Sequence, residues 1–199
     1  MQDQEAEWLA HAQRGDQQAF TNLVETYQRP VYNLCYRMLG NAEDAEDAAQ
    51  ETFLRAYRSM RRYDRNRPFS TWVLSIAAHY CIDQIRKRRM AIVSIEDLPV
   101  PDLPDREPGP EFTVGQRQEL SRIRSLLEVL DGTDRSAVIL YYWYDFSYQE
   151  ISEALSLTVS AVKSRLHRAR RSMAQQWLEN QKKPQSLMAE RVQHESSYF

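Results

Sequence analysis

Residues 94–111 divide the chain into two parts, because their composition predicts a tether between domains. This segment reads SIEDLPVPDLPDREPGPE and holds five of the eight prolines of the 199-residue chain, six acids and one arginine. Proline lacks the backbone N–H that helices and sheets need, and so polar a segment cannot bury a core. We therefore expect a flexible acidic linker over residues 91–113 between domains at 1–90 and 114–180. The polar tail, residues 181–199, has no clear periodicity, and its role stays open.

Both flanking parts carry the spacing of helices. Apolar residues recur at steps of three and four, the chain has only five glycines, and no strictly alternating strand pattern occurs. In the first part we expect one helix that continues through Pro30 and ends at Gly40, and a second from about Asn41. A third helix should begin near Phe69 with Ser70 as its N-cap. The expected fold is all-α, with two small helical domains.

The second part contains a helix-turn-helix pattern. An apolar face begins near Val114, a helix is expected over residues 136–144, and Ser147 with Glu150 forms an S-x-x-E capping box. This box opens a short helix to Leu155, and residues 156–158 make a tight turn before the next helix. A short helix, a three-residue turn and a basic helix are the layout of a helix-turn-helix.

That basic helix holds five positive charges and no acid over residues 159–173, although the net charge of the chain is only -2. We expect its apolar side, Val162, Leu166, Ala169 and Met173, to face the core. The opposite side carries Lys163, Ser164, His167, Arg168 and Arg171. Lysine and arginine pair with guanine edges and neutralise phosphates, so this side is a candidate duplex-reading face. The alternative is an ordinary solvated basic helix.

A second basic region lies in the first domain. Between residues 54 and 90, ten basic residues face two acids, a net charge of +8. Tyr63, Phe69, Trp72 and Tyr80 are interleaved with the arginines. Bases of single-stranded nucleic acid stack on aromatic rings while the backbone follows positive charge. In the alternative interpretation, Phe69 and Trp72 simply belong to the core.

An acidic segment contrasts with these regions. Residues 41–51 carry five acids and no base, and Asp44, Asp47 and Glu51 share one helical face with Gln50 beside it. Such a face repels phosphate, so it favours a protein partner with basic residues. A solvated acidic face is the alternative.

Several classes of function are disfavoured. No run of eighteen apolar residues and no secretion signal occur, so we expect a cytoplasmic protein without direct membrane insertion. Cys35 and Cys81 lie in apolar helical patterns and are expected to be reduced core thiols. The four histidines are scattered, and no carboxylates cluster with metal-ligand spacing. We therefore expect no catalytic residue, metal or cofactor, and no enzymatic activity.

Four ordered motifs resemble those of bacterial RNA polymerase sigma factors. They are DAAQE at residues 47–51 with Phe53, PFSTW at 68–72, IDQIR at 82–86, and SYQEI at 147–151 together with VKSRLHRAR at 162–170. The resemblance covers about residues 7–178. It is closest to the extracytoplasmic-function class of the sigma-70 family, which keeps two helical domains joined by a linker.

The resemblance implies three binding surfaces. A docking face for the clamp coiled coil of core RNA polymerase would consist of Asp44, Asp47, Gln50, Glu51 and Phe53. Melting of the minus-ten promoter element and capture of an unstacked base would involve Arg62, Arg65, Asn66, Arg67, Phe69, Trp72, His79, Asp83 and Arg86. Duplex recognition of the minus-thirty-five element would involve Lys163, Ser164, His167, Arg168 and Arg171. The acidic linker would run toward the RNA exit path.

The resemblance also implies promoter-directed transcription of a stress or envelope regulon and a cognate anti-sigma factor as a further partner. The class has fewer melting aromatics than primary sigma factors, and Trp72 has no neighbouring tryptophan, which implies strict dependence on a good promoter. Two positions depart from the family pattern: His79 stands where asparagine is common, and Ser160 where glycine is frequent. Base preference in the melted element is therefore left open. The competing hypothesis is a free-standing helix-turn-helix regulator whose first domain dimerises or senses a ligand.

Overall fold

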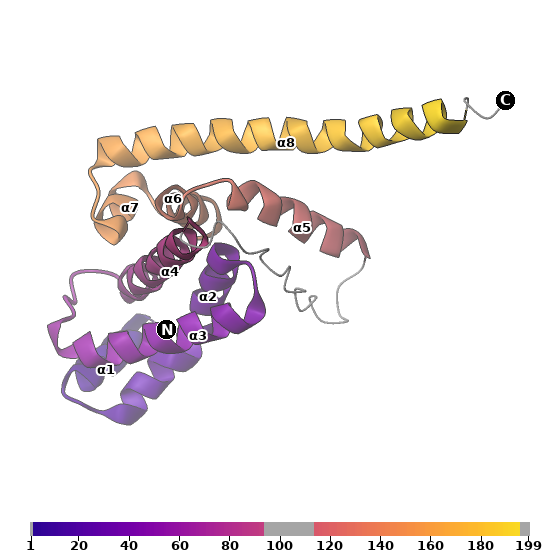
Figure 1. Ribbon diagram of the computed structural model, residues 1–199. Helices are drawn as coiled ribbons and strands as arrows, with labels where there is room; N and C mark the ends of the chain where they lie inside the picture. The colour runs from indigo at the N-terminus through magenta and orange to yellow at the C-terminus, as the bar shows by residue number, and fades with distance from the viewer. Residues whose placement is uncertain (1, 94–113, 196–199) are drawn as a thin grey trace.

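The computed structural model describes residues 2–93 and 114–195, with side chains over 4–91 and 119–182. The N-terminal unit contains α1 (Gln2–Gln13), α2 (Gln17–Leu39), α3 (Ala42–Ser59), the short 3-10 helix η1 (Met60–Arg62) and α4 (Phe69–Val93). The C-terminal unit contains α5 (Val114–Glu128), α6 (Gly132–Trp143), α7 (Tyr148–Leu155) and α8 (Val159–Glu195), as Figure 1 shows. The all-α prediction is confirmed: neither described range contains a strand.

Local signals fix the ends of α2. The side chain of Asp16 caps its first turn by accepting the amide of Ala19 at 3.1 Å. The helix continues through Pro30 and ends at Gly40, whose φ of 87° lies in the left-handed region that glycine tolerates. The amide of Gly40 donates to the carbonyl of Tyr36 at 2.9 Å. The predicted course of this helix is therefore confirmed.

The next two helices begin differently. The predicted start of a helix at about Asn41 is confirmed, and the structure shows Asn41 as its N-cap: its side chain accepts the amide of Asp44 at 2.8 Å. The prediction that Ser70 caps α4 is wrong, since Ser70 lies inside the first turn. The carbonyl of Pro68 already accepts the amide of Trp72 at 3.1 Å, which places the start of the helix before the serine.

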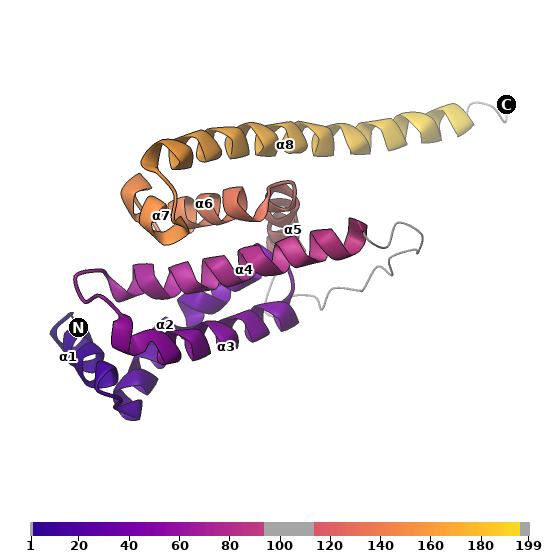
Figure 2. The same cartoon turned by 60° about the vertical axis from the view of Figure 1, so that its left-hand side comes forward.

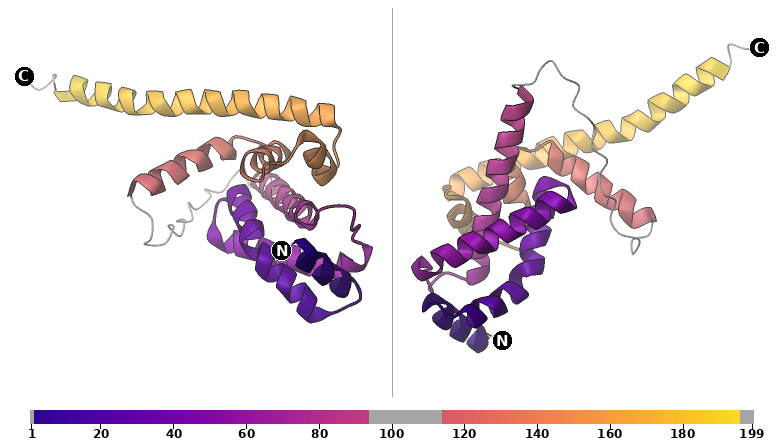
Figure 3. Two further views of the ribbon diagram at one scale, coloured as in Figure 1. Left: turned by 180° about the vertical axis from the view of Figure 1, so that it is seen from behind. Right: turned by 60° about the horizontal axis from the view of Figure 1, so that its bottom comes forward.

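The C-terminal unit contains the predicted helix-turn-helix. The capping box of α7 is formed: the amide of Ser147 donates to Glu150 Oε2 at 2.8 Å, and the amide of Glu150 donates to Ser147 Oγ at 3.2 Å. Ser156 ends α7 with a φ of 55°. Asp131 caps α6, which begins at Gly132, earlier than expected. The backbone of α8 stays helical to Glu195, beyond the predicted domain end, and projects past the other helices (Figure 3).

The two units pack against each other and share one continuous apolar core. Figure 2 shows α6 and α7 between α8 on one side and α4 on the other, while α2 also contacts α6. The sequence did not predict this packing. Of the predicted linker, residues 91–93 extend α4 and residues 94–113 lie outside the described residues, so the domain boundaries stay predictions.

The two cysteines lie in the core of the N-terminal unit. Cys35 and Cys81 are fully buried and free, as predicted. A hydrogen bond between the two thiols, together with burial, raises the pKa of Cys81 above its usual range. Both thiols therefore act as small apolar core groups.

Candidate nucleic-acid and protein interfaces

The first turns of α8 present a preformed basic face. Val162, Leu166 and Ala169 are buried, and Met173 is half-buried. The five predicted duplex-reading residues are exposed on the other side of the helix: Lys163, Ser164, His167, Arg168 and Arg171. The predicted separation of an apolar buried side from a polar exposed side is confirmed. These apolar residues recur every three or four positions along α8, so they pack together on α6 and α7.

An aspartate that was not predicted from the sequence forms ion pairs with two arginines of α8. Asp134, in the first turn of α6, is only 8% exposed and lies 2.6 Å from Arg165 Nη1. Its other oxygen lies 3.7 Å from Arg168 Nη2, and Asp131 lies 3.7 Å from Arg165. These carboxylates orient Arg165 and Arg168 and neutralise part of their charge. No local pattern pairs residues so far apart in sequence.

The predicted acidic face of α3 is divided by ion pairs. Asp47 and Gln50 are exposed, whereas Glu51 accepts from Arg55 Nε at 2.7 Å. Asp44 forms a salt bridge with Arg88 of α4 and also accepts from Asn41. Burial alone raises the pKa of Asp44, but these two hydrogen bonds outweigh it and hold the pKa below 3.8. Asp44 therefore helps α3 to pack on α4. Of the three carboxylates predicted to share this face, Asp47 is the exposed one.

Beside this face lies a groove between α2 and α3. It has a volume of about 520 Å³, and Phe53 and Gln50 line it together with Tyr32, Ala49 and Glu46. Phe53 is half-buried against the core. The lining also includes Arg29, so the groove offers two aromatic rings, one carboxylate and one guanidinium. Such a groove fits an amphipathic helix.

The loop before α4 carries the predicted minus-ten arginines. Arg62, Arg65 and Asn66 are exposed, and Arg65 donates to the carbonyl of Ala6 at 3.3 Å. Arg67 is partly buried, and its Nε and Nη2 atoms are buried without a hydrogen-bond partner among the described residues. Buried donors of this kind are costly to leave unpaired, so a movement that exposed the Arg67 side chain would let it bind a phosphate or a base.

The aromatic residues near this loop pack on one another. Phe69 is only 1% exposed; its ring centroid lies 5.5 Å from that of Trp72 and 5.1 Å from that of Tyr27. Tyr63 is also buried, and burial raises its pKa to about 12. The structure therefore places Phe69 in the core, as the alternative interpretation expects, and its part in minus-ten binding stays a prediction. Trp72 remains partly exposed.

The remaining predicted minus-ten residues follow one side of α4. His79 is exposed, and its Nδ1 lies 2.8 Å from the carbonyl oxygen of Ser75. Asp83 and Arg86 form an ion pair of 3.3 Å. Arg86 also lines a cleft between α4 and α6, so this side of α4 borders the C-terminal unit.

Metal-ligating side chains do not cluster in the described ranges. There, no group of three or more histidine, cysteine, aspartate or glutamate side chains is placed to hold a metal ion. No helix in the same ranges is long and apolar enough to cross a membrane.

Two sequence families match the chain in the order of its units. The family described as Sigma-70 region 2 matches residues 23–90, and Sigma-70, region 4 matches residues 120–173. This combination defines the sigma-70 class of DNA-binding transcription initiation factors. The ECF RNA polymerase sigma factor SigW of Bacillus subtilis is 36% identical over 84% of this chain and 94% of SigW. RNA polymerase sigma factor CnrH of Cupriavidus metallidurans is 33% identical over 83% of this chain and 90% of CnrH.

The chain therefore belongs to the extracytoplasmic-function (ECF) RNA polymerase sigma factors. CnrH in complex with the cytosolic domain of CnrY matches 86% of this chain and 95% of CnrH, with a TM-score of 0.64 and 27% identity. The sigma factor RpoE from Bartonella quintana, solved with the anti-sigma factor NepR, covers 79% of this chain and 96% of RpoE. Its TM-score is 0.63 and its identity 18%, so it shares the fold. Family membership confirms the resemblance and disfavours a free-standing regulator.

Proposed function

We propose that this chain binds core RNA polymerase and directs it to promoters that carry separate minus-ten and minus-thirty-five elements. The observation that carries this proposal is the segregation of charge onto different helices. An acidic face and an apolar groove lie on α3, whereas basic residues line the α4 region and α8. One surface suits a protein and the other two suit DNA, as the role of a sigma factor requires.

The polymerase would dock on α3. Gln50 lines the groove together with Phe53, and Asp47 is exposed on the same helix, so an amphipathic helix with basic residues could bury apolar side chains in the groove and pair with Asp47. Glu51 would contribute after exchanging its pairing with Arg55. Asp44 would act indirectly, because its salt bridge with Arg88 fixes α3 against α4.

The minus-thirty-five element would be read as duplex by α8. Lys163, His167 and Arg168 are exposed on the side that a major groove can accept. Arg171 lies one turn later and is suited to a phosphate. Because the helix is already capped and packed, little ordering is needed when DNA binds.

The minus-ten element would be held as a single strand. Unstacking a base costs a few kcal/mol, which contacts from the loop arginines and from α4 must offset. Arg62, Arg65 and Arg67 would follow the phosphates, and Trp72 offers a partly exposed ring. None of these contacts makes or breaks a covalent bond. We therefore propose a cytoplasmic, non-enzymatic role without cofactor.

A cognate anti-sigma factor is part of the same proposal. The related RpoE was solved with an anti-sigma factor, and CnrH with the cytosolic domain of CnrY.

The docking role can be tested with the full chain and purified core RNA polymerase. Asp47→Lys should weaken binding at least tenfold, because it places like charges across the interface. Glu7→Lys, which reverses an exposed charge on α1, is the matched control. Equal affinities of wild type and Asp47→Lys would remove α3 from the interface.

A further inference from the structure

We propose that α1 positions the loop and the aromatic ring that would hold the minus-ten strand, with Gln13 as the positioning residue. The inference rests on the proposed function, because it concerns the same single-strand surface. α1 precedes residues 23–90, the part of the chain that matches Sigma-70 region 2, so the family match assigns α1 no role. Figure 2 shows α1 beside η1, where the loop to α4 begins.

The N-terminal unit fixes α1 along one side. Leu9 and Ala12 are buried in the core, and Trp8 packs against it. The carbonyl of His11 accepts the amide of Asp16 at 3.1 Å, which closes the turn into α2. A helix held in this way is a rigid support for side chains that reach a neighbouring loop.

Gln13, the last residue of α1, contacts the start of this loop. Its Nε2 donates to the carbonyl oxygen of Tyr63 at 2.7 Å, although the two residues are 50 positions apart. The bond is partly buried, where a hydrogen bond is stronger than in open water. Because Tyr63 directly follows η1, the bond fixes the backbone where the loop leaves that helix.

Tyr63 connects Gln13 to residues proposed to hold the strand. The hydroxyl of Tyr63 donates to the carbonyl of Arg67, near the other end of the loop. Its ring centroid lies 4.8 Å from that of Trp72 and 5.6 Å from that of Phe69. One tyrosine therefore joins Gln13 both to the backbone of a loop arginine and to the partly exposed ring of Trp72.

Two further contacts join α1 to the same surface. Arg65 Nη2 donates to the carbonyl of Ala6 at 3.3 Å, and the guanidinium keeps other donors for a phosphate. The hydroxyl of Tyr27 in α2 donates to Glu5 Oε2 at 3.1 Å, and the ring of Tyr27 lies 5.1 Å from that of Phe69. α1 thus supports the loop at its start, in its middle and, through α2, at the beginning of α4.

These contacts favour binding because they hold the backbone of the loop before a strand arrives. A loop that became ordered only on binding would lose conformational freedom at that step, and this loss would lower the affinity. With the backbone held by α1, only side chains such as that of Arg67 have to move.

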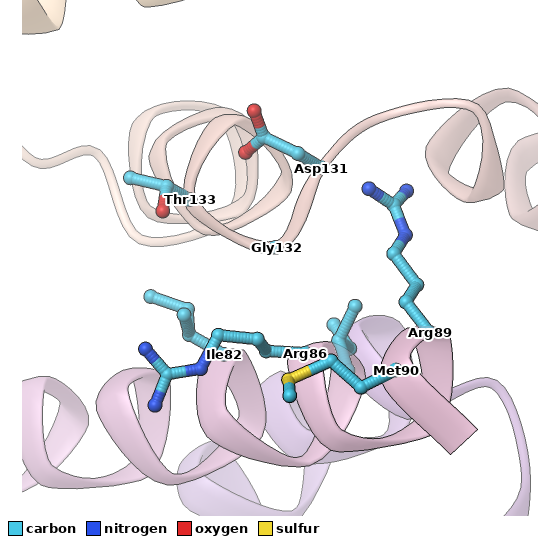
Figure 4. Close-up of a pocket in the computed structure, with 8 residues that line it drawn as sticks. Ile82, Arg86, Arg89, Met90, Asp131, Gly132 and Thr133 are labelled. Atoms are coloured by element: carbon cyan, nitrogen blue, oxygen red, sulfur yellow. The ribbon is translucent and has the colours of Figure 1, made fainter. Parts of the chain in front are cut away.

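The opposite end of the single-strand surface has a different neighbour. Figure 4 shows Arg86 and Met90 of α4 facing Asp131 and Thr133 across a cleft of about 510 Å³. None of the described residues of α1 lines this cleft. A change in α1 should therefore weaken contacts at the loop and leave those of Arg86 unaffected.

Fork-junction DNA tests the inference. The holoenzyme of core RNA polymerase and the full chain is titrated with a fragment of a promoter that it transcribes, in which the minus-ten non-template strand is single-stranded. Gln13→Glu keeps the size of the side chain but removes the donor, so the affinity should fall about three- to tenfold. Gln4→Glu, the same change at an exposed residue of α1, should bind like wild type. Equal affinities of the two variants would overturn the inference.

A duplex that carries only the minus-thirty-five element separates positioning from a general loss of structure. Gln13→Glu should bind this duplex as tightly as wild type, because the proposed reading residues lie on α8. An equal loss on both DNAs would make Gln13 a purely structural residue and would also overturn the inference. A wild-type holoenzyme that transcribes no promoter would instead contradict the proposed function.

A double-variant cycle tests the connection through Tyr63. Tyr63→Phe removes the hydroxyl that donates to Arg67 and keeps the ring, so it should also weaken fork-junction binding. Because both changes break one chain of contacts, Gln13→Glu/Tyr63→Phe should lose less affinity than the product of the two single losses. Tyr142→Phe, at an exposed tyrosine of α6, is the matched control for Tyr63→Phe. Losses that multiply would overturn the connection and, with it, the assignment of Gln13.

Discussion

The two DNA-binding surfaces of this sigma factor differ in how complete they are before DNA arrives. On α8, all five predicted reading residues are exposed, and their helix is fixed by a buried apolar side and a capped neighbour. Around α4, Phe69 is buried, Asp83 and Arg86 are paired, and the helix borders the C-terminal unit. The proposed duplex-reading surface is exposed in full, whereas the proposed single-strand surface would have to rearrange to bind DNA.

This difference matches the two tasks. Duplex DNA offers the edges of its bases without distortion, so a rigid helix can read them. A single strand must first be unstacked, and a surface that is permanently open and basic would bind any nucleic acid.

The largest expected effect comes from the shared core. Leu166 is fully buried on the inner side of α8, so Leu166→Ala should lower the free energy of unfolding by about 2–5 kcal/mol in urea denaturation. Because the two units share one core, hydrogen exchange in α4 should accelerate as well. Leu34→Ala, the same change at a fully buried leucine of α2, is the matched substitution for Leu166→Ala. If Leu166→Ala left α4 unchanged, the units would be independent in solution.

Next in size is the loss of one duplex contact. Arg168→Ala should weaken binding to minus-thirty-five duplex by about 1–3 kcal/mol and relax specificity at one base pair. Titration with duplexes mutated at each position measures both the affinity and the specificity. A loss that was uniform over all sequences would make Arg168 a phosphate contact. Binding of the single-stranded element should not change, which separates the two surfaces experimentally.

A smaller effect concerns the aspartate beneath the recognition helix. Asp134→Asn keeps the size of the side chain but removes the charge that holds Arg165. Freed to contact phosphate, Arg165 should strengthen binding to non-specific duplex and steepen the dependence of log affinity on log salt by about 0.9. Asp145→Asn is the control, because Asp145 is exposed and asparagine tolerates its φ of 53°. A parallel loss of stability and of all DNA binding would indicate a purely structural role.

The smallest effect is the dependence of stability on acid. The pKa of Asp44 is lower in the folded chain than its ordinary 3.8, so its pairing stabilises the fold above that value. This stabilisation should fade as the pH falls below about 4, through the lowered pKa. Half-exposed ion pairs contribute at most about 1 kcal/mol. Asp44→Asn should therefore flatten the acid limb of an unfolding curve slightly, and an unchanged limb would contradict the pairing with Arg88.

Features set by neighbouring residues were predictable from the sequence. The end of α2 at Gly40, the capping box of Ser147 and Glu150, and the exposed side of α8 each depend on a few local positions. In α1, by contrast, no apolar stripe predicts a helix. Contacts with distant residues stabilise α1 instead, such as the 2.7 Å hydrogen bond that Gln13 donates to the carbonyl of Tyr63.

The packing of the two units is the clearest case of a non-local feature. Arg135 and Met38 are 97 positions apart, and neither lies in a motif that predicts their contact. Phe69 is similar: its motif indicates DNA, but the aromatic neighbours that bury it come from two other segments. Which residues of distant segments contact each other depends on how the helices pack in three dimensions. The spacing of residues along one helix does not specify this.

In vitro transcription on a library of promoter fragments, with purified core RNA polymerase and mapping of RNA 5′ ends, tests the central claim most directly. The full chain should produce discrete start sites preceded by two shared sequence elements, and Asp47→Lys and Arg168→Ala should each reduce the transcripts. Start sites identical to those of core polymerase alone would contradict the account.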